Sequence, residues 1–305
     1  MLVNYAQTTH SNMKIYAAGR NRKKMELRFG CENSYLEFLE HDLSKPINFH
    51  KSVDYIIHAA GNAHPSAFQN DPIGTIIGNV NGTYDLLEYA KTHSAQRLLF
   101  ISTGEVYGKY TDGVMEFDET YSGSIDSTSV RSSYPNSKRT AETLCAAYAK
   151  SGELSTVIVR PCHTYGPSLT TEDSRAHAQF IRAVLDNQDI LMTSEGNQIR
   201  SYCYIADCAS IIITVLINGE NGEAYNSANP ESIASIADFA RTVARLKDRQ
   251  VIFCSPTQKD ISMRSPITRQ VLSSRKIESL GWRGQYSLEK GIFNTLMILS
   301  EAREE

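Results

Sequence analysis

A tyrosine and a lysine four residues apart, Tyr134 and Lys138, are the side chains of this sequence best suited to proton chemistry. On a helix, residues at this spacing lie on one face. A phenol has an unperturbed pKa of about 10 and is a poor base near neutrality. An ammonium group held beside the phenol favours the phenolate and lowers that pKa. The pair therefore predicts a proton acceptor for a hydroxyl group that is about to lose hydride.

A second polar segment lies upstream, at residues 102–108 (STGEVYG). It overlaps an apolar run, and residues 97–103 (RLLFIST) predict a buried strand whose end presents Thr103 and Glu105. Parallel sheets bind ligands at the carboxyl ends of their strands. We therefore expect these polar groups to lie at a ligand-binding edge, together with the tyrosine and lysine.

The elements that must position these groups are short β-rich runs that alternate with helical stretches. This alternation predicts βαβ units and a parallel sheet, and thus an α/β fold. The expected strands and helices of the first half are strands at 13–18, 53–60, 97–103 and 155–162, and helices at 81–93 and 134–151.

Beyond residue 167 the alternation loosens, and this half predicts a smaller substrate-binding lobe rather than a second sheet domain. Its expected elements are helices at 175–186, 207–217, 233–246 and 288–302, with a short strand at 250–254. Asp207 is expected to be the N-cap of the second of these helices. A long irregular segment, residues 109–133, directly precedes Tyr134, and this position favours a functional lid over a disordered loop.

The composition is that of an ordinary globular protein, with 305 residues, a net charge of −3, 41% hydrophobic and 21% charged residues. No basic run is interleaved with aromatic residues, so a nucleic-acid partner is not expected. The longest apolar run, residues 211–217, is far shorter than the roughly 20 residues that span a bilayer. The six cysteines have no metal-type spacing, and the N-terminal region lacks a signal peptide's apolar stretch. We expect a cytoplasmic protein with free thiols, no metal and no membrane contact.

With these residues in view, the chain resembles the extended short-chain dehydrogenases/reductases, the family of nucleotide-sugar epimerases, dehydratases and decarboxylases. The resemblance covers nearly the whole length. The motifs that carry it are residues 40–43 (EHDL), 58–61 (HAAG), 79–83 (NVNGT), 102–108 (STGEVYG), Tyr134-x-x-x-Lys138, 160–167 (RPCHTYGP), 196–201 (GNQIRS) and 279–282 (SLGW). Each motif alone is a weak signal, but the probability that all of them occur by chance in this order and spacing is very small.

The resemblance implies a Rossmann-type doubly wound parallel sheet with a smaller C-terminal α+β lobe. The NAD(P)-binding domain would comprise residues 1–165 and about 204–228. The nucleotide-sugar-binding lobe would comprise about residues 166–203 and 229–305. It also implies a homodimer built on a helix bundle that includes the helix of Tyr134, with Ala141, Leu144, Ala147 and Tyr148 suited to that face.

The resemblance also assigns roles by position. Thr103, Tyr134 and Lys138 would be the catalytic triad, with Glu105 as a further proton-transfer group. The cofactor contacts would come from Arg20, Asp42, Leu43, Ala59, Ala60, Gly61, Asn79, Ser102, Tyr134, Lys138, Pro161 and His163. The substrate, a nucleotide-diphosphate sugar, would be held by Thr103, His163, Arg200 and Arg264. His163 stands where the family usually has a substrate-contacting Asn, and an arginine such as Arg200 suits a diphosphate.

One departure from the family pattern is the absence of a Gly-x-x-Gly-x-x-Gly turn, whose backbone N–H groups would hold a pyrophosphate. Residues 1–7 resemble the end of the helix that follows such a turn. The strand before the turn would be central, so its absence predicts exposed apolar flanks and unpaired strand edges. We expect the natural reading frame to start roughly 20–40 residues upstream. The alternative is a cofactor-deficient or non-catalytic paralogue that still binds nucleotide sugars.

The cofactor preference rests on residues 19–22 (GRNR), where no acidic side chain is present for a ribose 2′-hydroxyl. Arg20 would either accept the 2′-phosphate of NADP or stack on the adenine. Dehydratases and decarboxylases of the family return the hydride that they remove and generally keep NAD bound. NAD is therefore the expected cofactor, with NADP as the alternative.

The residues after Thr103 bear on the type of reaction. Oxidation at sugar C4 gives a ketone from which dehydration, decarboxylation or 4-epimerisation can follow. Family dehydratases acting on thymidine-diphosphate glucose typically show Thr-Asp-Glu, whereas this chain has Thr103-Gly104-Glu105, the pattern of UDP-glucuronate decarboxylases. Simple epimerases usually lack the glutamate. We expect decarboxylase or dehydratase chemistry over 4-epimerisation, with a reductase that consumes NADPH as a further alternative.

Overall fold

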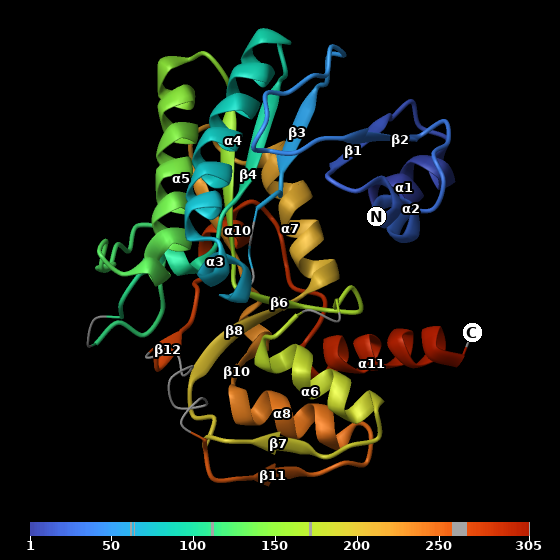
Figure 1. Cartoon of the computed structure of the whole chain (residues 1–305), viewed down its shortest axis with the longest axis vertical. Helices are drawn as coiled ribbons and strands as arrows, with labels where there is room; N and C mark the ends of the chain where they lie inside the picture. The colour runs from blue at the N-terminus through green and yellow to red at the C-terminus, as the bar shows by residue number, and fades with distance from the viewer. Residues whose placement is uncertain (62, 64, 111–112, 171–172, 258–266, 305) are drawn as a thin grey trace.

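The structure is a computed structural model that describes residues 1–61, 63, 65–110, 113–170, 173–257 and 267–304 (Figure 1). Its main sheet is four-stranded and parallel, in the order β3-β4-β5-β9. The strands are β3 (Tyr55–His58), β4 (Arg97–Ile101), β5 (Thr156–Pro161) and β9 (Ala224–Ser227). These β-strands and the helices between them confirm the expected α/β fold.

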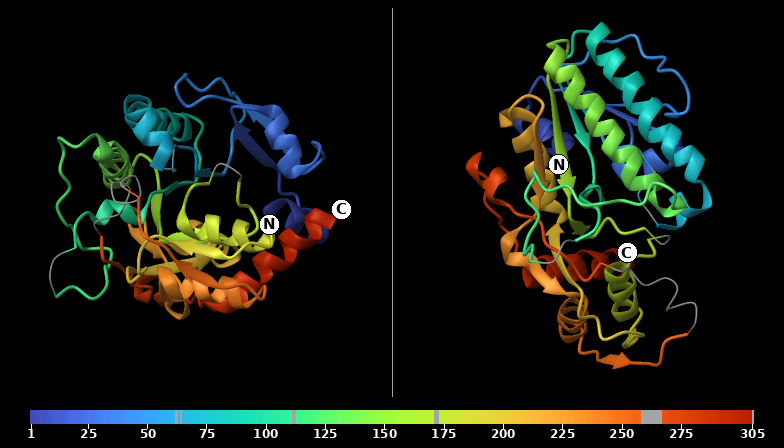
Figure 2. Two further views of the ribbon diagram at one scale, coloured as in Figure 1. Left: turned by 60° about the horizontal axis from the view of Figure 1, so that its bottom comes forward. Right: turned by 90° about the vertical axis from the view of Figure 1, so that its left-hand side faces the viewer.

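Two helical layers cover the main sheet, and the alternation of side chains along its strands explains why. Helices α4 (Pro72–Thr92) and α5 (Ser133–Ser151) cover one face, and α7 (Ile205–Asn218) covers the other (Figures 1 and 2). On β4, Leu98 and Phe100 pack with the α4/α5 layer, whereas Leu99 packs with α7. Because successive side chains of a strand point to opposite faces, a strand buried on both faces must be apolar throughout.

A separate pair of parallel strands, β1 (Ile15–Gly19) and β2 (Leu36–Glu40), lies beside the main sheet with α1 (Leu2–Thr9) and α2 (Arg22–Phe29). Among the described residues, neither β1 nor β3 pairs with a strand on its other side, so the expected unpaired edges are present. Tyr55 of β3 is 45% exposed, whereas Leu98 of β4 is fully buried.

The second half of the chain has its own small sheets and core. One sheet contains β6 (His163–Tyr165), β8 (Ile199–Tyr204), β10 (Ile233–Ser235) and β12 (Arg269–Gln270), and the other pairs β7 (Ile190–Met192) with β11 (Val251–Phe253). The helices are α6 (Ala176–Leu185), α8 (Ile236–Arg245), α10 (Arg275–Ser279) and α11 (Leu288–Glu304). Phe239 and Tyr202 lie in the core between these elements. No helix in the described part of the chain is long and apolar enough to cross a membrane.

The local structure differs from expectation at the start of α7. Helix α7 begins at Ile205 with Tyr204 as its N-cap, so the assignment of Asp207 as the N-cap is wrong. Asp207 is instead buried in the first turn, where its carboxylate accepts hydrogen bonds from the Asn229 side chain and the Gln285 backbone. In the segment before α5, Phe117 is buried against Tyr107 and bridges to Leu272, so its described part packs on the body of the protein.

A buried ion pair attaches α5 to the main sheet. Arg160 at the end of β5 contacts both carboxylate oxygens of Glu142 on α5, at 2.9 and 2.7 Å. The two side chains are only 14% and 10% exposed. Arg160 also donates to the Tyr107 hydroxyl at 3.1 Å and to the Glu119 carbonyl at 2.8 Å. The guanidinium is thus fully engaged in a region that water reaches poorly.

Replacing Glu142 by glutamine should destabilise the protein by about 3–5 kcal/mol, because it leaves the buried Arg160 charge without a counter-ion. Urea unfolding of the wild type and Glu142→Gln measures this change. Glu153→Gln is the matched control, since its pair with Lys91 is 46% and 40% exposed. That control should cost less than about 1 kcal/mol, and an equally small loss in Glu142→Gln would contradict the assignment.

Candidate active site

The polar side chains expected to do chemistry gather at the carboxyl ends of β3 and β4 and the start of α5. Thr103 follows β4 and is the N-cap of the short helix η1 (Gly104–Tyr107), where its hydroxyl accepts the Glu105 backbone N–H at 3.2 Å. Tyr134 and Lys138 lie in the first two turns of α5, which follows η2 (Val130–Ser132). Pro135 in the first turn of α5 lacks only an N–H that the helix start leaves unpaired anyway.

Lys138 is a buried cation, with 4% of its surface exposed. Its Nζ donates to the Ile101 carbonyl at 2.9 Å and lies 4.5 Å from the centre of the Phe100 ring. Burial lowers the pKa of this ammonium from 10.5 to about 8, with the nearby Glu142 carboxylate acting in the opposite direction. The lysine thus links α5 to the end of β4, and its pKa lies about one unit above neutral pH.

Tyr134 is 5% exposed, and its ring stacks on Phe68 of α3 (Pro65–Asn70) at 5.0 Å and 7°. Burial raises the pKa of the Tyr134 phenol to about 12; the Thr103 hydroxyl lowers it, and the Glu105 carboxylate raises it further. The expectation that Lys138 gives this phenol a lowered pKa is therefore wrong for this geometry. Desolvation dominates, and the lysine directs its hydrogen bond to the backbone of β4.

Backbone and side chains of three elements meet beside Lys138. The Asn79 side chain of α4 donates to the Ser137 hydroxyl of α5 at 2.9 Å. Gly61, after β3, has φ +149°, and a Cβ there would lie 2.8 Å from Asn79 Oδ1 and 3.8 Å from Lys138 Nζ. His58 at the end of β3 contacts the Thr83 hydroxyl through Nε2 at 3.0 Å, and burial lowers its pKa to about 3. The histidine is therefore neutral near pH 7.

These observations fit the reacting half of a nicotinamide dinucleotide. Within the described residues, the Ser102 hydroxyl, the Ser133 hydroxyl and His58 Nδ1 are buried without a hydrogen-bond partner. Gly61 leaves the backbone accessible where a side chain would collide with Asn79. Buried polar atoms normally find partners, so each of these three atoms is a candidate partner for a bound polar ligand. The sequence contains no glycine-rich turn for the pyrophosphate, so the fit concerns the nicotinamide end.

The remaining residues expected to contact a cofactor lie at the ends of several strands. Arg20 directly follows β1, Asp42 and Leu43 follow β2, and Pro161 ends β5. Asp42 accepts the Ser44 backbone N–H and hydroxyl, both at 3.0 Å, and so closes a local turn. Ala59 and Ala60 follow β3 and are exposed. Their cofactor contacts stay predictions.

His163 and Arg200 lie on adjacent strands, β6 and β8. Burial, together with the positive charge of Arg200, lowers the pKa of His163 to about 3, and its Nδ1 has no partner among the described residues. Arg200 is 4% exposed and donates to the Ile199 and Ile267 carbonyls at 2.9 and 2.6 Å. Its predicted contact with a diphosphate is not tested by this geometry. Arg264 lies outside the described residues.

Two arginines that the sequence analysis did not single out lie near the phenol. Arg131 pairs with Glu105 at 2.9 Å, and Arg175 forms a two-pronged pair with the buried Asp173. The positive charges of both arginines lower the pKa of Tyr134 against the effect of burial. Arg131 is three residues before Tyr134, and this proximity was the only sequence signal for it.

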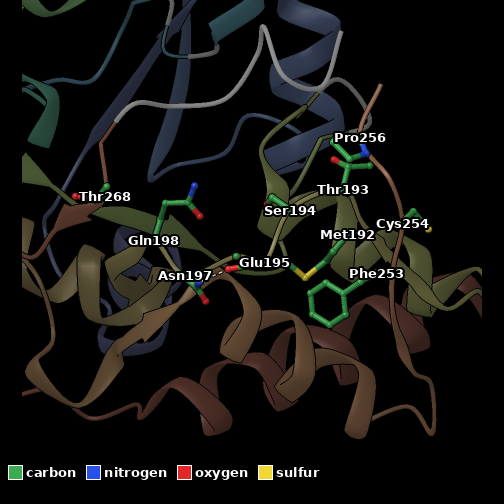
Figure 3. A pocket seen from close by; sticks show the side chains of 11 residues that line it. Met192, Thr193, Ser194, Glu195, Asn197, Gln198, Phe253, Cys254, Pro256 and Thr268 are labelled. Atoms are coloured by element: carbon green, nitrogen blue, oxygen red, sulfur yellow. Dashed lines mark hydrogen bonds between the residues drawn. The ribbon is translucent and has the colours of Figure 1, made fainter. Parts of the chain in front are cut away.

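A separate pocket of about 580 Å³ lies in the second half of the chain (Figure 3). It is formed by the segment between β7 and β8 and by the end of β11, with the lining residues Met192, Thr193, Ser194, Glu195, Gly196, Asn197, Gln198, Phe253, Cys254, Pro256 and Thr268. Asn197 donates to Glu195 at 2.7 Å, as the dashed line shows. The Gln198 side-chain oxygen is buried without a partner in the described part of the chain.

A parallel α/β sheet with a Ser-Thr strand end and a Tyr-x-x-x-Lys helix at its carboxyl edge defines the short-chain dehydrogenase/reductase class. Residues 6–228 match the "NAD dependent epimerase/dehydratase family", and the chain belongs to this family. The expected family is thus confirmed, and NAD is the cofactor named in its description.

Similar proteins include decarboxylases and enzymes that epimerise or dehydrate nucleotide sugars. UDP-glucuronic acid decarboxylase 1 of Xenopus tropicalis is 32% identical over 92% of this chain, which spans 64% of that relative's length. UDP-glucuronic acid decarboxylase 6 of Arabidopsis thaliana is 33% identical over 84% of this chain and 72% of the relative.

Solved structures agree in fold. A Thermotoga maritima UDP-glucose 4-epimerase with UDP-glucose has a TM-score of 0.80 at 18% identity, covering 100% of this chain and 95% of that chain. A Bacillus anthracis dTDP-glucose 4,6-dehydratase in complex with NAD has a TM-score of 0.78 at 20% identity, covering 99% and 93%. At these identities the likeness shows the shared fold.

The depressed pKa of Lys138 predicts a pH-dependent stability. Its pKa falls from 10.5 to about 8 on folding, so the unfolded chain binds more protons in that window. The free energy of unfolding therefore rises with pH from about 8 to 10.5. Below pH 8 the lysine is protonated in both states, and the full cost of burying its charge lowers the stability. Lys138→Met removes the buried charge, so its stability relative to wild type should fall by about 3 kcal/mol across this window.

Urea unfolding at several pH values measures that difference. Lys150→Met, at the exposed end of α5, shows the effect of removing a lysine from the same helix. A difference between Lys138→Met and wild type that stays constant with pH would contradict the buried ammonium.

Proposed function

We propose that the protein is an NAD-dependent enzyme that oxidises a nucleotide-diphosphate sugar transiently at C4, and that UDP-glucuronate decarboxylation is its reaction. The observation that supports this best is the grouping of Thr103 and Glu105 around the Tyr134 phenol, with both side chains acting on its pKa. Gly104 separates the two, as in the decarboxylase pattern. The similarity to UDP-glucuronic acid decarboxylases supports the same reaction.

In this mechanism the chain's own residues bind, orient and move a proton. NAD, when bound, supplies the hydride acceptor and a positive charge that favours ionisation of a nearby phenol. Tyr134 accepts the proton of the C4 hydroxyl while Thr103 orients that hydroxyl by a hydrogen bond. The C4 ketone makes the C5 carboxylate part of a β-keto acid, which loses carbon dioxide and leaves an enolate across C4 and C5. A proton would then be delivered to C5 and the hydride returned to C4, while the C4 oxygen would regain its proton from Tyr134. Glu105, whose charge acts on the Tyr134 pKa, is the group that we propose to assist the return of a proton to C5.

Lys138 has a supporting role in this proposal. Its ammonium is held 2.9 Å from the Ile101 carbonyl, at the end of the strand that presents Thr103. With a pKa of about 8, the side chain is mostly in its ammonium form near pH 7. We propose that it keeps the floor of the site positively charged while the phenol is deprotonated.

One other reaction and one non-catalytic alternative remain candidates. The retained Glu105 also suits a base that acts at C5 in a 4,6-dehydratase, and the solved structures include such enzymes. A cofactor-deficient or non-catalytic paralogue that still binds nucleotide sugars is the other candidate. A denatured sample that releases NAD would argue against the paralogue.

The pocket of Figure 3 is our proposed site for the nucleotide end of the substrate. It belongs to the segment that we assign to the nucleotide-sugar lobe, about residues 166–203 and 229–305, and it ends where β8 begins. Arg200 is the second residue of β8, and the unpaired oxygen of Gln198 is an acceptor for an N–H of a base.

We further propose a homodimer through the outer face of α4 and α5. On α4, Ile73, Ile76, Ile77 and Tyr84 are 75%, 42%, 45% and 48% exposed, which is unusual for one stripe of a helix. Of the α5 residues expected on this face, Ala147 is exposed. Ala141 is fully buried inside the chain's own core, so its assignment to the dimer face is wrong.

Tyr134→Phe should lower turnover of UDP-glucuronate by about 10²- to 10⁴-fold, because the proton acceptor is lost. Substrate binding should stay within a few-fold, since only one hydroxyl is removed. Mass spectrometry of UDP-, dTDP-, GDP- and CDP-sugars after incubation separates loss of carbon dioxide from loss of water or a change in retention alone. Tyr55→Phe, at the exposed start of β3, is the control. Wild-type turnover in Tyr134→Phe would end the proposal.

Ile77→Lys should shift the protein from dimer to monomer in sedimentation velocity, because a charge would be placed in the proposed apolar contact. Leu191→Lys, at a 64% exposed position of β7, should leave the mass unchanged. A wild-type protein that sediments as a monomer at micromolar concentration would refute the dimer.

A further inference from the structure

Arg131 connects the carboxylate of Glu105 with the aromatic surroundings of the phenol. One guanidinium nitrogen lies 2.9 Å from Glu105 Oε2. The centre of the guanidinium lies 4.7 Å from the centre of the Phe68 ring. Phe68 is fully buried, and its ring stacks on the Tyr134 ring with the two ring centres 5.0 Å apart. The Phe68 ring thus contacts both the Arg131 guanidinium and the Tyr134 phenol ring.

This arrangement uses properties that distinguish arginine from lysine. A planar guanidinium can place its face over an aromatic ring while its edge donates to a carboxylate. The ring of Phe68 cannot move easily, because it is fully buried and held against Tyr134. The plane of Phe68 therefore fixes Arg131, and Arg131 in turn restricts where the Glu105 carboxylate can lie.

The Arg131–Glu105 pair is poorly placed to stabilise the fold. Its side chains are 46% and 30% exposed, and ion pairs at such positions are screened by solvent. The Arg160–Glu142 pair, at 14% and 10% exposure, is the one placed to hold α5 against the sheet. The geometry of the exposed pair therefore calls for another explanation.

We propose that Arg131 is a positioning residue that fixes the Glu105 carboxylate beside the Tyr134 phenol. This inference rests on the proposed function, because it gives Arg131 a role through Glu105 and Tyr134. The charges of Glu105 and Arg131 act in opposite directions on the pKa of Tyr134. While the pair is intact, their effects offset each other. Without Arg131, the carboxylate would be free to turn and its charge would oppose ionisation of the phenol.

A double-mutant cycle on the full chain tests this role. Arg131→Met keeps apolar contact with Phe68 but removes the charge, and it should lower kcat for UDP-glucuronate at least about tenfold with little change in KM. The pH at which kcat reaches its plateau should also rise. Glu105→Gln should be impaired as well, and the double variant should lose much less activity than the product of the two single losses, because Arg131 acts mainly through Glu105. Arg131→Lys should restore part of the activity.

The matched control is Arg245→Met, whose arginine pairs with Glu289 at 3.0 Å on an exposed surface far along the chain. It should leave kcat unchanged. Thermal unfolding of Arg131→Met should stay close to that of the control. An unchanged kcat in Arg131→Met would overturn the positioning role. So would a double variant whose losses multiply, or a large drop in the unfolding temperature of Arg131→Met.

Crystal structures of the wild type and Arg131→Met provide a readout that needs no activity. The Glu105 carboxylate should lose its single position beside the phenol in the variant, and an unchanged carboxylate would overturn the inference. Failure of the proposed function would show differently, as full turnover in Tyr134→Phe. An active wild type, an inactive Tyr134→Phe and an unimpaired Arg131→Met would leave the function intact and remove only the role of Arg131.

Discussion

The site depends on one buried contact, the hydrogen bond from the Lys138 ammonium to the Ile101 carbonyl. It joins the helix that carries the phenol to the strand that ends in Thr103. A cation buried to this degree loses its hydration, and the Phe100 ring and the Ile101 carbonyl replace only part of it. The pKa of Lys138 is lowered because these contacts do not fully replace the lost hydration. Burial also raises the pKa of Tyr134. The pKa shifts of both side chains therefore have the same main cause.

Charges are arranged along α5 in two groups with different surroundings. Toward its middle, Glu142 and Arg160 form a shielded pair that holds the helix on β5. Before its first turn, Arg131 and Glu105 form a half-exposed pair close to the phenol. Tyr134 and Lys138 lie between these groups. The shielded pair thus attaches α5 to the sheet, and the half-exposed pair sets the charge near the phenol. The two ion pairs differ in how far water reaches them.

The parts of the fold that the sequence predicted are those with strong short-range signals. The central residues of β4 and β5, 98–101 and 157–159, are apolar because both faces are covered, and Tyr134 and Lys138 are recognisable from a four-residue spacing. The small strands β6 and β12 were missed, since two or three residues carry no periodicity. The direction of the Tyr134 pKa was also missed, because it depends on burial by distant segments. Arg131 was missed because a charge beside a loop usually indicates only solvent exposure.

The ring of Phe49 has a consequence for the part of the domain that lies beside the main sheet. Phe49 touches Tyr16 of β1 on one side and Tyr89 of α4 on the other. The strand pair β1/β2 and the helical layer of the main sheet are thus joined here through aromatic rings. Because a ring contact is lost as a whole when its central ring is removed, damage at Phe49 would loosen both of its partners at once.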